Sequence, residues 1–567
     1  MKRLLLTLCL LPFAFCFSEG QTTHNLEIIW QKAKPETSIY WRYWGLNILG
    51  GDVNGDGYSD FVSSTDCVLD AFGWLKWNIY IFNGGTTLST IPSQVLTHDT
   101  AGGHPVMCIA DFNHDGYGDL ALGDAYGTGL NQGKGQVNIH YGSASGVSPT
   151  PDLVIGGYGS ATATGFGNTI SAGDINGDEI SDLVVGAPAY PVSSDRNGRV
   201  YVYYGDPLGL YTWPDIILNG HYSPVYYENF GGKTACIDLN NDGYDDLLVS
   251  GPMNSTNAIG AGKVYYYVSK GAPIDTIADG WISGEGYEHN LGAFNVSGID
   301  VKPSMASPTG WFGTPFWPTG SFGEGKCYFV PGDTVGELTP EWTVVGEDTG
   351  LGYWSSSAGY ADDGSLQDFL VGASPAYHNT GVAYLWLRRP VMNNQYDAFI
   401  RGRYPGPVGG GPGDVLGAMV APAGDVDGDG KDEFLVSNYY ADSSNMIRLC
   451  KYTGPNAVSG PSTPLGDRPQ VRLFPNVPNP FSRITTIRYQ LAKPGRVSLR
   501  VYDVAGRLVR TLIREDTNSG SYETTTGAGS VTWDGRDNQG GRVAPGVYLY
   551  QFKAGGERMT GKMILLR

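Results

Sequence analysis

The chain has 567 residues, of which 56 are Asp or Glu and 37 are Lys or Arg, so its formal net charge is −19 at pH 7. This acidic balance excludes nucleic acid as a natural partner, and no phosphate-cradling glycine loop, nucleophile elbow or zinc-ligand spacing occurs. Glycine (83 residues) and proline (34) are abundant and no segment has a convincing helical period, which excludes a helical protein.

The first twenty residues have the pattern of a secretory signal peptide. A basic start, Met1-Lys-Arg, precedes an apolar run that ends at Phe17 and is too short to span a bilayer. Small residues before Gln21 suit cleavage there. We therefore expect a secreted or cell-surface protein of bacterial type, with no transmembrane segment once residues 1–20 are removed.

An acidic loop recurs five times, beginning at Asp52, Asp111, Asp174, Asp238 and Asp425. Oxygen-bearing side chains at loop positions 1, 3, 5 and 9, with a peptide carbonyl at position 7, form the all-oxygen cage that Ca²⁺ prefers. The sequence predicts about five calcium sites. Their expected ligands, loop by loop, are Asp52, Asn54, Asp56, Tyr58 and Asp60; Asp111, Asn113, Asp115, Tyr117 and Asp119; Asp174, Asn176, Asp178, Ile180 and Asp182; Asp238, Asn240, Asp242, Tyr244 and Asp246; and Asp425, Asp427, Asp429, Lys431 and Glu433.

Two other interpretations of these loops remain. An EF-hand or dockerin loop shares the opening but needs a carboxylate at position 12, where the first loop has Ser63, and it needs flanking helices. Asp, Asn and Gly clusters also occur as plain turns, although five in register argue against that. In the third loop Glu179 replaces the glycine at position 6, so we expect that loop to be distorted or weaker.

The spacing of the loops predicts seven repeats. Successive loops begin 59, 63 and 64 residues apart, and the remaining gap of 187 residues divides into three similar steps. Two repeats inside the gap have therefore lost ligands. Each repeat contains four short alternating stretches, in the third repeat 169–172, 182–186, 199–205 and 215–219.

Four strands in each of seven repeats predict an all-β fold, a seven-bladed β-propeller over residues 21–455. An outer-strand phrase follows every repeat except the last, and the matching phrase, Asn25 to Trp30, stands near the N-terminus. We expect it to supply the fourth strand of blade seven and so to close the ring.

A linker, residues 456–470, separates this region from a tail of different composition, residues 471–567. Segments 485–491, 497–502, 546–552 and 562–566 of the tail alternate apolar and polar residues. The tail is therefore predicted to be a small β-sandwich of immunoglobulin type.

A ligand surface is expected on the face opposite the acidic loops, where the loops from strand two to three and from strand four to the next blade meet. Aromatic residues in these segments suit sugar faces or protein surfaces. The candidate ligand-binding residues are Trp41, Trp44, Trp74, Trp77, Tyr222, Tyr227 and Trp317. The expected partner is an extracellular protein or polysaccharide.

Histidines on the same face keep an enzyme as the alternative. Polysaccharide lyases built on seven-bladed propellers use His and Tyr to move a proton from a sugar carbon, and His221 next to Tyr222 is the pair to test. Neighbouring residues on a strand point to opposite faces, which argues against this pair. We predict a binding protein and no enzyme.

A Phe-Gly pair before one acidic loop and a Gly-Ala-Pro run after it form a second motif, Phe166-Gly167 with Gly186-Ala187-Pro188, and Phe230-Gly231 with Gly251-Pro252 nearly repeats it. In this the repeats resemble the FG-GAP family, which builds the integrin α-subunit propeller and many bacterial secreted proteins. The resemblance covers residues 25–452. It implies a seven-bladed propeller with calcium in the loops.

The tail contains five short motifs in a fixed order, at 475–481, Tyr502 to Arg507, Trp533-Asp534-Gly535, 544–548 and 562–567. In these the tail is similar to the C-terminal sorting domain of the type IX secretion system, itself close to the immunoglobulin-like domain of flagellar hook-capping proteins. The resemblance implies export across an outer membrane, with the secretion machinery as a partner. A permanent stalk domain is the alternative.

Overall fold

The computed structural model describes two compact units, residues 1–460 and residues 461–567, each built from strands. None of the described segments is a helix of the length and apolarity needed to cross a membrane. The structure describes residues 22–566 except 34–43, 66–67, 70–74, 101–104, 128–133, 158–163, 191–196, 222–226, 241, 272, 294–295, 300–308, 315–323, 332–335, 339, 341, 347–350, 363–366, 374–380, 389–395, 403–415, 439–445, 455–470, 474–480, 492–496, 505, 514–526 and 555–556. The predicted signal peptide and linker lie outside these residues.

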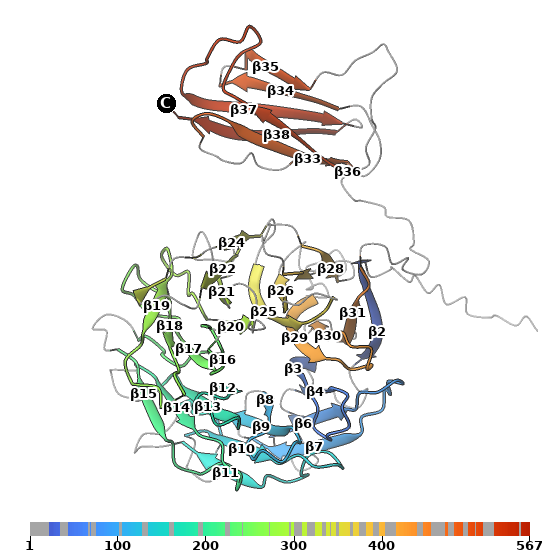
Figure 1. Cartoon of the computed structure of the whole chain (residues 1–567), viewed down its shortest axis with the longest axis vertical. Coiled ribbons are helices and arrows are strands. Elements are labelled where there is room, and N and C mark those ends of the chain that lie inside the picture. Colours follow the sequence, from blue (N-terminus) through green and yellow to red (C-terminus); the bar gives the residue numbers. More distant parts are fainter. Residues whose placement is uncertain are drawn as a thin grey trace, which may run out of the picture. The chain divides into compact units, whose positions relative to one another are not determined.

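The first unit is a seven-bladed β-propeller, as the repeats predict (Figure 1). Its first three blades are antiparallel sheets that follow the chain from the inner to the outer strand. Blade one contains β3 (Trp44–Gly51), β4 (Asp60–Thr65), β6 (Leu75–Phe82) and β7 (Gln94–Asp99), with β5 (Val68–Leu69) also on β6; blade two contains β8 (Val106–Ala110), β9 (Asp119–Asp124), β10 (Gln136–His140) and β11 (Leu153–Gly156); blade three contains β12 (Thr169–Gly173), β13 (Asp182–Ala187), β14 (Arg199–Tyr203) and β15 (Ile216–Asn219).

The remaining four blades include the two repeats that have lost ligands. Blade four contains β16 (Thr234–Ile237), β17 (Asp246–Gly251), β18 (Lys263–Tyr267) and β19 (Gly280–Ser283), with β23 (Gly336–Glu337) parallel to β19; blade five contains β20 (Val296–Ile299), β21 (Thr309–Thr314), β22 (Lys326–Pro331) and β24 (Trp342–Val345); blade six contains β25 (Leu351–Gly359), β26 (Asp368–Ala373), β27 (Val382–Trp386) and β28 (Ala398–Arg401); blade seven contains β29 (Leu416–Gly424), β30 (Glu433–Asn438), β31 (Met446–Tyr452) and β2 (Leu26–Ala33). First strands of neighbouring blades contact one another around the ring, and β29 contacts β3.

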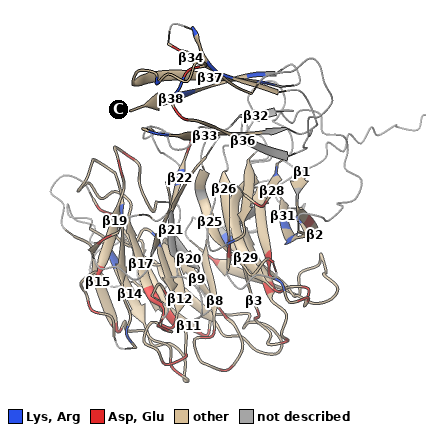
Figure 2. Ribbon diagram, turned by 45° about the horizontal axis from the view of Figure 1, so that its top comes forward, with Lys and Arg blue, Asp and Glu red and all other residues tan. Residues whose placement is uncertain are grey.

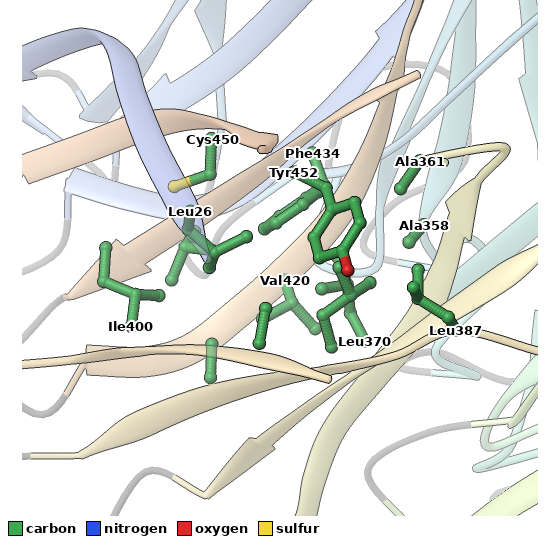
Figure 3. Packing of buried hydrophobic residues seen from close by; sticks show 14 of the residues in the cluster. Leu26, Ala358, Ala361, Leu370, Leu387, Ile400, Val420, Phe434, Cys450 and Tyr452 are labelled. Carbon is green, nitrogen blue, oxygen red and sulfur yellow. The ribbon is translucent and has the colours of Figure 1, made fainter. Parts of the chain in front are cut away.

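The ring closes through the N-terminal strand, as predicted from its missing partner. β2 pairs antiparallel with β31, with Leu26 opposite Tyr452, and Figure 1 shows the two strands side by side. Leu26 is buried in a cluster that includes Cys450 and Phe434 of blade seven and Ile400 of blade six (Figure 3). A short strand that the sequence did not predict, β1 (Thr22–His24), pairs with β28 of blade six. The N-terminal segment therefore joins the last two blades.

The second strand of a blade is buried on both faces because neighbouring blades pack against each side of its sheet. Leu183, Val184 and Val185 of β13 are fully buried, and two of them belong to one hydrophobic cluster and the third to another. This explains why these strands are continuous apolar runs in the sequence, whereas an outer strand such as β15 alternates buried and exposed residues.

The second unit is an immunoglobulin-like sandwich of two antiparallel sheets, as predicted. One sheet contains β32 (Val471–Leu473), β33 (Thr485–Leu491) and β36 (Gly527–Trp533); the other contains β35 (Leu508–Ile513), β34 (Val497–Asp503), β37 (Gly546–Ala554) and β38 (Glu557–Leu565). Trp533 of the first sheet and Tyr550 and Phe552 of the second meet in its core. Figure 2 marks Lys and Arg in blue and Asp and Glu in red on the described ribbons of both units.

Candidate metal centres and ligand face

The acidic loops join the first and second strands of their blades, and their side chains fold each loop in the same way. In the first loop, Asp52 at position 1 accepts hydrogen bonds from the backbone N–H groups of Gly55 (2.7 Å) and Gly57 (2.9 Å). Asn54 at position 3 accepts one from Asp56 (2.9 Å). These bonds recur with small variations in the loops that start at Asp111, Asp174, Asp238 and Asp425.

The carboxylate at position 9 lies deeper, at the start of the second strand. Asp246 is fully buried and accepts backbone hydrogen bonds from Leu239 (2.9 Å) and Ser269 (2.7 Å). Asp60, Asp119 and Asp182 make the equivalent pair of bonds. Position 9 therefore ties the loop to the turn after the third strand.

Burial disfavours the charged form of these carboxyl groups. It raises the pKa of Asp60 to about 6, those of Asp119 and Asp182 to about 7, and that of Asp246 to about 8. Neighbouring loop carboxylates raise them further. A bound cation would offset both effects, so the donor set of blades one to four fits Ca²⁺ held by positions 1, 3, 5 and 9 and the position-7 carbonyl.

Neighbouring loops are also joined to each other, which the sequence analysis missed. The backbone N–H at position 8 of one loop donates to the position-1 carbonyl of the preceding blade: Ser59 to Asp425 (3.0 Å), Gly118 to Asp52 (2.9 Å), Ser181 to Asp111 (3.2 Å), Asp245 to Asp174 (2.9 Å) and Asp432 to Tyr360 (3.0 Å). We call this series the loop belt. It runs through blade six, blade seven and blades one to four.

Side chains also join neighbouring loops: the residue at position 4 of one loop lies against the residue at position 7 of the loop in the next blade. A Cβ added to Gly55, at position 4 of blade one, would lie 2.7 Å from the ring of Tyr117, at position 7 of blade two. Gly177 stands in the same relation to Tyr244, and Gly428 to Tyr58. Position 4 is His114 in blade two, where the next blade has Ile180 at position 7. A tyrosine at position 7 thus accompanies glycine at position 4 of the preceding loop. This pairing of residue types can be recognised from the sequence without the structure.

The third loop keeps its geometry despite Glu179. This residue has φ 68°, in the left-handed region that glycine occupies at the same position in the other four loops. Its N–H donates to Asp174 at 2.8 Å, as the glycine of the first loop does to Asp52. The expected distortion is therefore absent, and the loop instead holds a strained residue.

Blade seven differs from the other four loop-bearing blades because a lysine enters its loop. Lys451 Nζ lies 2.5 Å from Asp427 Oδ2 and 2.6 Å from Asp429 Oδ2, and 3.4 Å from Glu433 Oε1. Asp425, Asp427 and Glu433 place oxygens within 4.8 Å of one another, so the loop also has an arrangement suited to a metal. Lys431 is among the ligands expected from the sequence, whereas Lys451 is not.

The candidate ligand-binding residues differ in whether the structure describes them and in how far they are exposed. Trp77 is fully buried in β6 and packs between blades one and two with Val62 and Leu96, so its assignment to a ligand surface is wrong. Tyr227 is 48% exposed. Trp44 begins β3, but its side chain lies outside the described residues, as do Trp41, Trp74, Tyr222 and Trp317.

Tyr227 has exposed apolar neighbours that the sequence analysis missed. Met253 and Ile259 in the β17–β18 loop and Tyr287 in the β19–β20 segment are exposed on the same face of the ring. Backbone hydrogen bonds join these loops: Met253 donates to Glu228 (3.2 Å) and Glu288 to Ile259 (2.8 Å). We call Tyr227, Met253, Ile259 and Tyr287 the blade-four patch. An aromatic-only search could not find its two aliphatic members.

A buried carboxylate fixes the patch from below. Glu228 has no exposed surface and accepts hydrogen bonds from Asn254 Nδ2 (2.7 Å), the His221 backbone N–H (2.7 Å) and the Tyr265 hydroxyl. Because these partners come from three segments of blades three and four, Glu228 pins the loops together. The patch is therefore presented by a rigid support.

His221 does not meet the requirements of a proton-transferring pair in the described residues. Its ring stacks on that of Tyr265, with centroids 5.6 Å apart, and the Tyr265 hydroxyl already donates to Glu228. Burial and the Glu228 charge raise the pKa of Tyr265 far above its usual value. The partner proposed from the sequence, Tyr222, lies outside the described residues.

Family models match parts of both units. An FG-GAP repeat model matches residues 166–203 and 230–267, an FG-GAP-like repeat model matches residues 52–122, and a FlgD Ig-like domain model matches residues 482–558. The predicted FG-GAP repeats and immunoglobulin-like tail are thus confirmed.

Two curated relatives illustrate how far the likeness extends. Integrin alpha-V of Gallus gallus is 31% identical over 218 residues, which cover 36% of this chain and 20% of the relative. Phosphatidylinositol-glycan-specific phospholipase D of Rattus norvegicus is 36% identical over 169 residues, which cover 28% of this chain and 19% of the relative. The chain thus spans about a fifth of the length of these relatives. A solved structure titled "Structure of Dos1 propeller" aligns with a TM-score of 0.35 at 9% identity, covering 76% of this chain and 96% of that one.

Proposed function

We propose that this FG-GAP propeller is a calcium-stabilised extracellular protein that binds a protein or polysaccharide and is not an enzyme. The observation that carries the proposal is the division of the ring into two faces. Acidic loops of common geometry gather on one face and the blade-four patch lies on the other. Similarity to integrin alpha-V supports an extracellular ligand-binding role.

Calcium has a structural role in this proposal. With a dissociation constant of about 0.1 to 1 mM, usual for extracellular modules, and about 2 mM calcium outside the cell, each site stabilises the fold by roughly 0.7 to 1.8 kcal/mol. The loop belt links each site to the next blade, so bound calcium also strengthens contacts between blades.

The ligand is proposed to contact the blade-four patch, which combines two tyrosines with two aliphatic side chains over the buried Glu228 support. Tyrosine presents a flat apolar ring and a polar tip, which suits both sugar faces and protein surfaces. Binding of the full chain to immobilised polysaccharides and extracellular proteins, with calcium present, tests the assignment.

Tyr227→Ala and Tyr287→Ala should each weaken retention at least about tenfold, typical of aromatic residues central to an interface. Trp213→Ala is the matched control, because Trp213 is 73% exposed but lies between β14 and β15, on the acidic-loop face. Equal loss in all three variants, or loss in the control alone, would contradict the assignment. Release of unsaturated sugar products that His221→Ala abolishes would instead support the lyase alternative.

The C-terminal domain predicted at residues 471–567 is proposed to direct export across a bacterial outer membrane through the type IX machinery. The support is the order of its sorting-domain motifs together with its FlgD Ig-like fold. A reporter fused to residues 471–567 should reach the cell surface or medium of a host with that machinery and stay in the periplasm of a mutant without it. Retention in the periplasm of both hosts would favour a permanent stalk domain.

A further inference from the structure

The loop of blade seven is shaped like the other acidic loops, yet a side chain of the same blade brings a positive charge into it. Lys451 Nζ contacts carboxylates at positions 3, 5 and 9 of the loop, Asp427, Asp429 and Glu433, at 2.5, 2.6 and 3.4 Å. The lysine side chain is only 16% exposed. Calcium would lie about 2.3 to 2.6 Å from these same oxygens, so the ammonium and the metal compete for one place.

The equivalent residue in the other four loop-bearing blades carries no positive charge. Five third-strand residues are equivalent because each pairs with the residue that follows position 9 of its own blade. They are Cys450 in blade seven and Phe82, His140, Tyr203 and Tyr267 in blades one to four. The residue after Cys450 is Lys451, and the residues after the other four are Asn83, Tyr141, Tyr204 and Val268. The lysine is therefore specific to blade seven.

A second difference in the same loop matches the lysine. Position 3 is Asn54, Asn113, Asn176 and Asn240 in blades one to four, and Asp427 in blade seven. Blade seven thus has four carboxylates at positions 1, 3, 5 and 9, whereas the others have three. Lys451 contacts this additional carboxylate at its shortest distance, and its charge returns the net charge of the cluster to that of the other loops.

We propose that Lys451 is the resident cation of the blade-seven loop, so that calcium occupies four loops of the propeller rather than five. This inference rests on the proposed calcium binding of blades one to four. Lys451 lies on β31, between β30 and the ring-closing strand β2, where it pairs with Glu27. The blade that closes the ring therefore has a loop whose carboxylates already hold a cation from the same blade, so its closure does not depend on calcium.

The test is the number of calcium ions bound by the full chain, measured by equilibrium dialysis and calorimetry in a chelator-treated preparation. The wild-type protein should bind four. Lys451→Met should bind a fifth, and the double variant Lys451→Met with Asp427→Asn, which restores the position-3 residue of the other loops, should also bind five. Lys431→Met is the matched control because it removes a charge near Asp429 but leaves Lys451 on Asp427, Asp429 and Glu433, and it should bind four.

Five ions in the wild-type protein, or four in both Lys451 variants, would overturn the inference. No binding by the wild-type protein would refute the proposed calcium role instead, and the lysine is then tested without calcium. In chelator, Lys451→Met should lower the Tm of the protein, and this Tm shift should shrink in the Asp427→Asn background because the two residues act as a pair. An undiminished shift would also overturn the inference.

Discussion

Blade six and blade four start their second strands with the same buried acid but differ in the loop before it. Asp368 accepts backbone hydrogen bonds from Ala361 (3.1 Å) and Arg388 (2.8 Å), just as Asp246 does from Leu239 and Ser269. Position 1 of blade six is Tyr360, where blade four has an aspartate. The position-9 acid therefore has a role that needs no metal, namely to fasten the loop to its blade.

The loop belt shows the same separation of roles. Tyr360 provides its carbonyl to Asp432 of blade seven, although it has no carboxylate to offer a cation. The backbone hydrogen bonds between blades thus form without calcium ligands. The carboxylates at positions 1 and 5, by contrast, are needed to bind calcium. The comparison predicts that blades one to four respond to calcium and that blade six does not.

Calcium removal has the largest expected effect. Four sites contributing about 0.7 to 1.8 kcal/mol each give a loss of about 3 to 7 kcal/mol in the free energy of unfolding on chelation. Hydrogen exchange with and without chelator locates the loss. Amides at loop positions 2 and 4–7 of blades one to four should exchange faster, while the Ala361 amide of blade six serves as an internal control. Equally faster exchange of the Ala361 amide would contradict the prediction that blade six does not respond to calcium.

Asp368→Ala tests the fastening role directly. Removing the carboxylate leaves two buried N–H groups without an acceptor, at about 1 to 3 kcal/mol each, so we expect a loss of about 3 kcal/mol in the free energy of unfolding. Denaturant unfolding should give the same loss with calcium and with chelator. Asp246→Ala, the matched variant in blade four, should cost more in calcium than in chelator, and equal costs would show that it holds no metal.

The sequence predicted the blade count, the ring closure and the acidic loops because each depends on a period or a missing partner along the chain. It failed where contacts between strands or between blades decide the outcome. Trp77 resembles an exposed aromatic in sequence but is buried by the neighbouring blade, and Lys451 reaches its loop from the third strand of the same blade. Such contacts join residues with no fixed spacing, so local patterns do not contain them.

Gly55→Ala measures the link between neighbouring loops. Gly55 has φ 69°, and a Cβ there would lie 2.7 Å from the Tyr117 ring. We expect a loss of about 2 kcal/mol, half from the backbone and half from crowding. Gly57→Ala is the control, because φ is 87° but no atom lies within 4 Å, and its loss should be about 1 kcal/mol. Thermal unfolding of both variants measures the two losses in stability. Equal losses would show that the contact between position 4 and the Tyr117 ring of the next loop does not contribute to stability.

The pH dependence of stability should also distinguish Asp368. Burial raises its pKa to about 8, from 3.8. Since the folded state holds the proton more tightly than the unfolded state, this carboxyl favours folding at low pH and its contribution is lost as pH rises through about 8. Between pH 7 and pH 9 the loss is about 1 kcal/mol. Asp368→Asn, studied in calcium, should remove that slope from the unfolding free energy, whereas an unchanged slope would assign it to other groups.

Glu179→Gly is the smallest expected change and sharpens the comparison among the loops themselves. The strained φ of Glu179 costs about 1 kcal/mol, and glycine relieves this but loses more entropy on folding, so the net gain in stability is about 0.5 kcal/mol. Because the loop already makes the shared hydrogen bonds, the calcium affinity of the third site should stay within about twofold, within the spread of comparable loops. Unfolding in chelator and calorimetry in calcium measure the two quantities. A gain in affinity with no gain in stability would mean that Glu179 distorts the site rather than straining the backbone.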